Sequence, residues 1–597
     1  MKLVKTTLIA CLVLFSLIFL YFVLSPNTNI NSKTCVDNTI KIAVYLPNMS
    51  NVMFDPLCSA MFFSHNIDYL SDSNLDTKLT TSNYNLLLVP KSEMSDDAAT
   101  AINKYISYGG SVWFFADPSY LLNESVKDNR ITILGDAIYS TNNTISANST
   151  ITINNTDSIT NGMPSEFNPI STKNKWYYFR SFSTKTGAIS GFNYNVLMNK
   201  GDCAMMIKFE NPETGSRVIY SNANMFISGG DWSYYKAGLS TKLFLQAKSW
   251  ILKSEPNTYG VDITYPKGDK QLTITLDDEQ AAAYEIPKVQ AFFDMERAQG
   301  LDPSSINTFF IVPTKNTTNS ALNFYSQNGD IHTLHPHFIT DWTNNQSVTD
   351  YNAFIKQAEG TINKVANVEN SGFKSWRFPS TAFCPNSMKA VTDNGYLIDS
   401  SCGRASIYGK IGTQEDNNLL FPKRIIIEGV KTNTLEMEAV SSYDINTANG
   451  SAFYDTYAQY LTYLANVNFP ANFIVAGHYQ GVMILPDYID EVSELLNSSK
   501  STNTSFATLD TLGIYINAVQ NSTIKATNSA TGVTVLVTAP TQIDNFTIKL
   551  TNIKNGVQAQ YDGVAIDKDN IIQDGSTYYV VHTVEVGTHT FTIMDKS

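Results

Sequence analysis

The chain has 597 residues, which is long enough for several domains rather than one. Hydrophobic residues make up 43% of the sequence, an ordinary share for globular protein that permits sizeable cores. The formal net charge is -13 and no stripe of lysine and arginine runs along the chain, which argues against nucleic acid and anionic membrane surfaces as partners.

The N-terminus carries a membrane-insertion signal. Lys2 and Lys5 precede an apolar run over 8–24, which at about 1.5 Å per residue is just long enough to cross a bilayer core. The positive flank predicts that everything after Ser25 lies outside the cell. We therefore expect residues 1–25 to form an uncleaved single-pass anchor in the cell membrane. A cleaved signal peptide and a secreted protein are the alternative.

Two further features agree with export. Cysteines close in sequence are disulfide candidates outside the cell, which pairs Cys35 with Cys58 and Cys384 with Cys402 and leaves Cys203 unpaired. Asn-x-Ser/Thr acceptors are frequent and predict a glycoprotein; they are Asn48, Asn123, Asn142, Asn148, Asn154, Asn316, Asn345, Asn449, Asn497, Asn503, Asn521 and Asn545.

An α/β domain follows a short polar stalk over residues 26–39. The apolar runs 40–46, 84–90 and 111–119 predict buried strands, and the helical periodicity of 96–110 predicts a helix between the last two. A strand, a helix and a strand at this spacing form a βαβ unit, which implies a parallel sheet covered by helices.

Residues 40–255 as a whole resemble, in pattern only, the class I glutamine-amidotransferase-like fold, a flavodoxin-like α/β architecture. Those enzymes place a nucleophilic cysteine on a sharp elbow between a strand and a helix, and a histidine serves it. Neither Cys58 nor Cys203 lies in a Gly-x-Cys-x-Gly context. We therefore expect this domain to be non-catalytic.

The last segment, residues 520–597, alternates between β-branched and polar residues. The runs 530–540 and 576–593 have a period of two and are bounded by turn residues, which predicts a small antiparallel β-sandwich. His582 and His589 lie inside such runs and are interpreted as ordinary strand residues.

Between these two domains, polar side chains follow apolar strands in a recurring order. In barrels of parallel strands, the carboxyl ends of the strands face the active site. Carboxylates, imidazoles and a guanidinium at such an edge are what a metal-dependent hydrolase needs. The residues concerned are Asp277, Asp278, His332, His335, His337, Arg377 and His478.

Residues 268–515 resemble the polysaccharide deacetylase (NodB-homology) domain, carbohydrate esterase family four. The resemblance implies an irregular (β/α) barrel. Five matches carry it in the family's order. The family's Thr-Phe-Asp-Asp-Gly motif is similar to Thr-Leu-Asp-Asp-Glu at 275–279, and the others are Thr-Phe-Phe at 308–310, Arg-x-Pro at 377–379, Gly-Tyr…Asp-Ser-Ser at 395–401, and the strand-His motif at His478.

The resemblance also implies a role for each matched position. Asp277 would be the general base that takes a proton from a metal-bound water. Arg377 would hold Asp277 ionised and oriented, and His478 would protonate the leaving amine. The implied cofactor is a divalent metal, with zinc favoured.

The metal ligands are the least regular part of this resemblance. Asp278 and His335 take the family's positions, but Ile339 stands where the family has its second histidine. Residues two apart in an extended segment point to the same side, so His337 is expected as the third ligand and His332 is expected outside the metal's ligand set.

Two other departures flank the expected site. Glu279 replaces the family's glycine, and Ser380 stands where an aromatic residue usually follows the Arg-x-Pro motif.

The sequence thus predicts a cell-surface, metal-dependent N-deacetylase. It would hydrolyse acetamide or acetyl ester groups of an N-acetylated polysaccharide or cell-envelope glycan. The alternative is a catalytically inactive relative that binds glycan or has a structural role in the envelope. The sequence leaves the oligomeric state open.

Overall fold

The structure is a computed structural model of the whole chain. It describes residues 41–47, 52–54, 66–89, 94–115, 122–123, 128–134, 139–140, 150–167, 178–179, 186–201, 203–221, 243, 246–252, 260–279, 281–336, 341–344, 346–367, 372–379, 382–401, 422–437, 441–442, 471–478, 488–529, 531–551 and 553–596. The expected anchor and stalk lie outside these residues. Within the described residues, no helix is long and apolar enough to cross a membrane.

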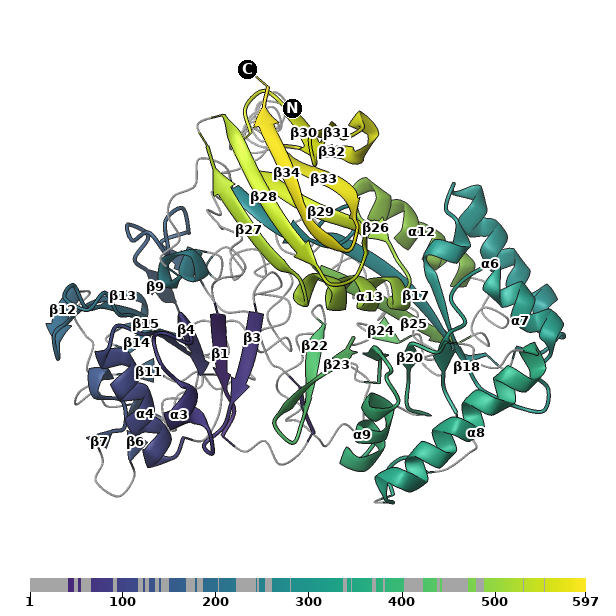
Figure 1. Ribbon diagram of the computed structural model, residues 1–597, viewed down its shortest axis with the longest axis horizontal. Helices are drawn as coiled ribbons and strands as arrows, with labels where there is room; N and C mark the ends of the chain where they lie inside the picture. The colour runs from purple at the N-terminus through teal and green to yellow at the C-terminus, as the bar shows by residue number, and fades with distance from the viewer. Residues whose placement is uncertain are drawn as a thin grey trace, which may run out of the picture.

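The N-terminal α/β region is built on a 12-stranded mixed sheet, at the left of Figure 1. One half is parallel and has the order β3-β1-β4-β5-β15. Its elements are β1 (Lys41–Tyr45), β3 (Asn66–Leu70), α3 (Leu75–Lys78), β4 (Leu86–Val89), α4 (Asp96–Ser107), β5 (Ser111–Phe114) and β15 (Arg217–Ser221).

The other half of this sheet is antiparallel. It continues from β15 through β14 (Cys203–Glu210), β13 (Phe192–Lys200) and β9 (Ile151–Ile153) to β10 (Glu166–Phe167). The shorter elements beside it are β6 (Leu122–Asn123), β7 (Asp128–Asn129), η2 (Thr132–Leu134), β8 (Tyr139–Ser140), β11 (Tyr178–Phe179) and β12 (Thr186–Ile189).

The predicted βαβ unit is confirmed. Ser95 caps α4, because its hydroxyl accepts a hydrogen bond from the backbone amide of Ala98 at 3.1 Å. The helix then buries Ile102 and Tyr105 against the sheet. Gly109 ends the turn at a φ of 89°, which favours glycine, and β5 pairs parallel with β4.

The middle of the chain forms a second sheet with the topology of a barrel. Along it the strands run β23-β21-β20-β19-β18-β17-β25-β24, and every neighbouring pair is parallel. From β17 to β23, neighbouring strands follow one another in chain order, and β24 and β25 then lead back to β17. Such a sheet would close into a ring if β23 paired with β24. Among the described strands those two are not paired, so the sheet is curled and open at that point.

Helices cover the outer face of this curled sheet (Figure 1). The strands are β17 (Lys270–Glu279), β18 (Asn307–Ile311), β19 (Thr333–Leu334), β20 (Ser375–Trp376), β21 (Ile398–Asp399), β22 (Lys423–Ile427), β23 (Val430–Glu436), β24 (Ser441–Ser442), β25 (Ala471–His478) and β26 (Ser505–Phe506). The helices of this region are α6 (Ile286–Ala298), η4 (Pro303–Ser305), α7 (Asn319–Ser326), α8 (Val348–Ala366), α9 (Pro385–Asp393), α12 (Tyr488–Ser501) and α13 (Leu509–Gln520), of which α13 lies against the inner face instead.

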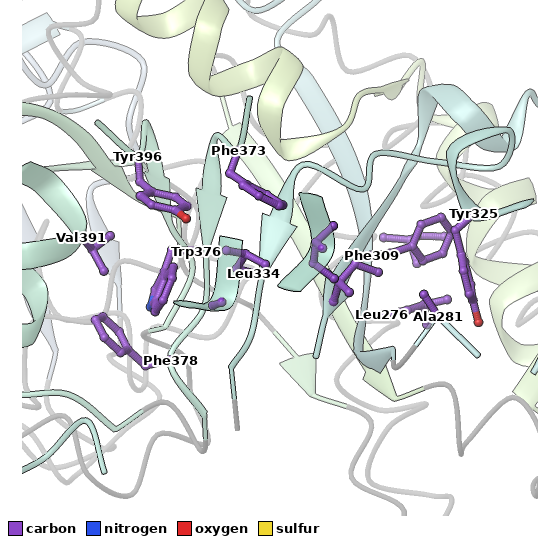
Figure 2. Packing of buried hydrophobic residues seen from close by; sticks show 14 of the residues in the cluster. Leu276, Ala281, Phe309, Tyr325, Leu334, Phe373, Trp376, Phe378, Val391 and Tyr396 are labelled. Carbon is purple, nitrogen blue, oxygen red and sulfur yellow. The ribbon is translucent and has the colours of Figure 1, made fainter. Parts of the chain in front are cut away.

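The two faces of the curled sheet have different chemistry. Leu276, Phe309, Leu334 and Trp376 are fully buried in the outer core, and Figure 2 shows this core running along the sheet. Side chains alternate between the faces of a strand, so the residues next to these four project to the inner face. Threonine and serine occupy many of those positions, and α13 lies against them; the amide of its Leu509 donates to the Thr308 hydroxyl at 3.1 Å.

Two antiparallel sheets form the C-terminal region and share one core, as the alternation predicted. Their strands are β16 (Gly260–Thr264), β27 (Thr523–Asn528), β28 (Gly532–Ala539), β29 (Ile543–Thr551), β30 (Val557–Tyr561), β31 (Val564–Ala565), β32 (Ile571–Asp574), β33 (Thr577–Val584) and β34 (Gly587–Asp595), with η6 (Lys568–Asn570) between two of them. β16 precedes the curled sheet in the chain but pairs with β29.

A second crossing connection joins the N-terminal region to the curled sheet. β2 (Val52–Phe54) pairs antiparallel with β22 at the end of that sheet. Ile426 of β22 packs in the core of the N-terminal region, and the Lys431 ammonium donates to the Ile67 carbonyl at 3.2 Å. These contacts make the two regions neighbours through side chains as well as backbone.

The expected disulfide between Cys384 and Cys402 is wrong. Cys384 is a buried free thiol at the N-cap of α9. Its sulfur lies 3.5 Å from both the Tyr351 hydroxyl and the Asn344 carbonyl, so packing under α8 rather than a covalent bridge fixes its place. Cys35, Cys58 and Cys402 lie outside the described residues.

Candidate active site

Residues from separate motifs meet in one layer at the carboxyl ends of the strands. Four side chains of this layer each come directly after an outer-core residue of β17, β18, β19 or β20. In the same order, they are Asp277, Phe310, His335 and Arg377. Alternation therefore directs them to the inner face. Parallel register places them side by side, as the sequence predicted for the active end of a barrel.

Arg377 is the centre of this layer and is almost completely buried. One terminal nitrogen, Nη1, donates to the Asp277 carboxylate and, at 3.1 Å, to the Thr275 hydroxyl. Its flat face covers the Phe310 ring, with 4.1 Å between the guanidinium carbon and the ring centroid. The predicted contact between Asp277 and Arg377 is therefore present.

The Asp-Ser-Ser sequence that ends β21 holds Arg377 in place. The backbone carbonyl and the hydroxyl of Ser400 accept from Nε and Nη2, both at 2.6 Å. The hydroxyl of Ser401 accepts from the Phe378 amide at 2.9 Å. The sequence singled out this stretch as a motif without giving these serines a role.

His335 adds an imidazole to the same layer. It is almost fully buried, and its Nδ1 lies 2.8 Å from the Arg377 carbonyl oxygen. A carbonyl can only accept, so in the neutral ring Nδ1 carries the proton and the lone pair is on Nε2. This is the form in which a histidine binds a metal ion.

A β-bulge interrupts β17 at its carboxyl end. Leu276 pairs with Phe309 and Glu279 pairs with Ile311, so Asp277 and Asp278 lie opposite the single residue Phe310. A regular strand would send two consecutive carboxylates to opposite faces, and a bulge relaxes that alternation. The side chain of Asp278 is not among the described ones, and its ligand role stays a prediction.

His478 lies beside Asp277 in the backbone register, and its role as general acid stays a prediction. It ends β25, and its Cα is the register partner of Asp277 on the neighbouring strand. Its side chain is not described. His337 lies outside the described residues altogether, so the expected third ligand stays a prediction.

His332 belongs to the other end of the sheet. It precedes β19 whereas His335 follows it, and three residues of extended chain span about 10 Å. Its Nδ1 pairs with the Asp330 carboxylate at 2.9 Å. The expectation that His332 lies outside the Asp277 site agrees with this placement.

A buried acid pair lies behind Arg377 on the outer face of the sheet. Asp399 and Glu436 are register partners on β21 and β23, and both are fully buried. Burial raises the pKa of Asp399, while hydrogen bonds from Glu436 and Ser401 act in the opposite direction. Neighbouring buried carboxyl groups share a proton more readily than both ionise.

No protein-family model matches the chain, and no curated protein matches it. Solved structures similar to part of it include a probable polysaccharide deacetylase from Pseudomonas aeruginosa PAO1. That structure has 12% identity and a TM-score of 0.31, over 42% of this chain and 93% of its own. A family 4 carbohydrate esterase from Bacillus anthracis has 15% identity and a TM-score of 0.23, over 42% of this chain and 85% of its own.

A CE4 family pseudoenzyme is also similar, with 10% identity and a TM-score of 0.24, over 44% of this chain and 73% of its own. Polysaccharide deacetylases are thus among the structural neighbours of part of this chain. The expected amidotransferase-like character of residues 40–255 stays unsupported.

Proposed function

We propose that the protein is a metal-dependent hydrolase that removes acetyl groups from an N-acetylated glycan at the cell surface. The observation behind it is that residues of three separate motifs meet at the carboxyl ends of parallel strands. Arg377 donates to Asp277, about 100 residues before it in the chain, and to Ser400, about 20 residues after it.

Asp277 is the general base of the proposed reaction. Its carboxylate takes a proton from the water that attacks the acetamide carbonyl. Arg377 orients that carboxylate and stabilises its charge through a charge-assisted hydrogen bond. Ser400 in turn fixes the guanidinium, so the base is held by a connected set of hydrogen bonds.

His478 is the general acid. Expulsion of the amine needs a proton donor, and an imidazole titrates in the useful range. The backbone register of β17 and β25 supports this role, since it sets the two residues side by side. The water loses its proton to one neighbour, and the leaving nitrogen gains a proton from the other.

The donor set fits a divalent metal, with zinc favoured. The protonated Nδ1 of His335 supports coordination through its other ring nitrogen, and Asp278 and His337 are the proposed companions. A bound zinc ion lowers the pKa of its water to about 7 and polarises a carbonyl oxygen.

The proposed site faces the outside of the cell. Lys2 and Lys5 before the apolar run 8–24 support an N-terminal anchor with the remainder of the chain exported. An N-acetylated envelope glycan is then the substrate class within reach.

Acetate release from acetylated chito-oligosaccharide tests the proposal. Asp277→Asn and His478→Ala should each lower turnover about 100-fold or more, the usual weight of acid–base groups. Asp393→Asn, at a partly exposed carboxylate on α9, is the control and should keep full turnover. If the wild type releases no acetate with any of several metals and acetylated substrates, the inactive glycan-binding alternative is the better account.

A further inference from the structure

A second group of possible metal ligands lies at the amino ends of the strands. Oxygen atoms of Asp330 and Asp510 and a ring nitrogen of His332 all lie within 4.8 Å of one another. Asp330 and His332 come from the connection between α7 and β19, and Asp510 is in the first turn of α13. Segments about 180 residues apart in sequence therefore meet here.

This group is distinct from the Asp277 site. A layer of hydroxyl side chains separates the two, and Ser375 of that layer donates to the Asp510 carboxylate. Arg377, two residues later on the same extended segment, reaches the Asp277 site. The two sites therefore lie at opposite ends of β19 and β20, on the same face of the sheet.

The two carboxylates of this group are largely shielded from solvent. The Asp330 side chain is only 8% exposed, and its Oδ2 is buried with no hydrogen-bond partner among the described residues. Asp510 is also buried. Two buried carboxylates side by side repel one another unless a cation or a shared proton lies between them.

The His332 imidazole supplies a possible ligand nitrogen and also connects the group to solvent. His332 is about half exposed, in contrast to the two carboxylates. Carboxylate oxygens with a histidine nitrogen form a donor set that zinc and similar divalent transition metals accept. Three protein ligands leave room for a water or a further donor from solvent.

We propose that Asp330, His332 and Asp510 bind a divalent transition-metal ion that ties α13 to the base of the curled sheet. α13 also packs on the C-terminal region, where the hydroxyl of its Tyr515 donates to the Thr264 carbonyl of β16 at 2.6 Å. The ion therefore acts as a structural clip between the proposed catalytic region and the C-terminal sandwich.

Zinc titration of the purified full chain tests the clip in a His335→Ala background, which removes the proposed catalytic metal. In that background zinc should still bind with a stoichiometry of one and raise the melting temperature. Adding His332→Ala should weaken this binding more than about 10-fold, since even lost outer-shell partners cost that much. His332 is half exposed, so this substitution is not expected to prevent folding.

Two further variants test which side chains bind the zinc ion. Asp510→Asn keeps the size of the side chain and should also abolish the thermal shift. His589→Ala removes another histidine paired with an aspartate, on β34, and should leave zinc binding unchanged. A loss with His589→Ala equal to that with His332→Ala would mean adventitious surface binding and overturn the proposal.

The same titration separates this inference from the proposed function. If the proposed active site binds no metal, the wild type should bind one equivalent, and His332→Ala should remove it. If zinc neither binds nor shifts melting in the His335→Ala background, Asp330 and Asp510 share a proton instead, and the clip is refuted.

Discussion

Burying a guanidinium is costly unless its N–H groups find acceptors, and Arg377 finds them on β17 and directly after β21. Asp277 and Thr275 come from β17, while both acceptors of Ser400 follow β21. The hydrogen bonds that offset the cost of burying Arg377 also fix the orientation of the Asp277 carboxylate. Stability and the proposed chemistry therefore depend on the same hydrogen bonds.

Substitutions at two neighbouring serines separate the effect on stability from the effect on turnover. Ser400→Ala removes an acceptor from Arg377, so we expect a lower free energy of unfolding, by about 1–3 kcal/mol, and slower acetate release. Ser401→Ala loses bonds to Phe378 and Asp399 but none to Arg377, so it should be destabilised similarly while turnover persists. Urea unfolding and acetate release measure the two. Equal losses of turnover would contradict this role of Ser400.

Glu296 should make the stability of the protein depend on pH. It is buried in α6 with the Asn307 amide donating at 2.8 Å, and burial raises its pKa from 4.5 to about 8. Between these values the folded protein keeps a proton that the unfolded chain has released, so stability falls as pH rises through that window. The slope is about 1.4 kcal/mol per pH unit for one full proton.

The variant Glu296→Gln should flatten this dependence. Its free energy of unfolding, measured by urea at several pH values, should exceed that of the wild type increasingly from pH 5 to pH 8. Asp294→Asn, at an exposed carboxylate on the same helix, should follow the wild-type curve. A wild-type curve parallel to that of Glu296→Gln would show that Glu296 ionises normally.

Part of the candidate site could be predicted from the sequence. The pairing of Asp277 with Arg377 was predicted from the motifs and is present. The roles of Thr275, Ser400 and Phe310 were not predicted, because hydroxyls and single aromatic rings give no periodic signal. Asp330 and Asp510 were also missed, since their proximity depends on α13 returning to the sheet from about 180 residues away.

At the scale of elements, α13 occupies the inner face of the curled sheet through a close contact. A Cβ on Gly513 would lie 2.4 Å from the Cδ1 atom of Ile398, which is fully buried in β21. Glycine inside a helix normally costs about 1 kcal/mol relative to alanine. Here it lets the helix approach the strand.

Two glycine-to-alanine substitutions should therefore have opposite effects. Gly513→Ala overpacks the contact with Ile398 and should destabilise by about 1–3 kcal/mol. Gly360→Ala in α8 meets nothing within 4 Å and should stabilise by up to about 1 kcal/mol. Chemical denaturation of both variants gives the signs. A stabilised Gly513→Ala variant would mean that α13 does not hold this position.

Elements with continuous apolar runs were predicted well, while short ones were not. β17, β18 and β25 correspond to such runs. β19, β20 and β21 have two residues each, which is too few for any period to be visible. Their place in the sheet comes from neighbours on both sides rather than from their own residues.

At the scale of the molecule, the chain crosses between regions instead of completing them one after another. β16 precedes the curled sheet but completes a sheet of the C-terminal sandwich, and β2 leaves the N-terminal region to join β22. Strand pairing between distant segments leaves no local pattern, so the sequence divided the chain into consecutive domains. The shared core around α13 then predicts that the curled sheet and the sandwich unfold together.

A buried ion pair at this junction tests that cooperativity. Asp269 lies between β16 and β17, and its carboxylate accepts from the Lys549 ammonium of β29 and from the Tyr579 hydroxyl at 3.1 Å. Lys549→Met leaves a buried carboxylate without its cation, which should cost about 3–5 kcal/mol. Hydrogen exchange should then accelerate in β17 and β28 alike, because one cooperative unit contains both strands.

An exposed pair supplies the matched control. Lys389 and Asp393 are 3.0 Å apart on α9 and both are partly exposed, so Lys389→Met should change the free energy of unfolding by less than about 1 kcal/mol. The decisive comparison is between the two strands in the Lys549→Met variant. Faster exchange in β28 with unchanged exchange in β17 would show that the sandwich opens independently. The junction would then be a contact between two separate folding units, despite the core that they share through α13.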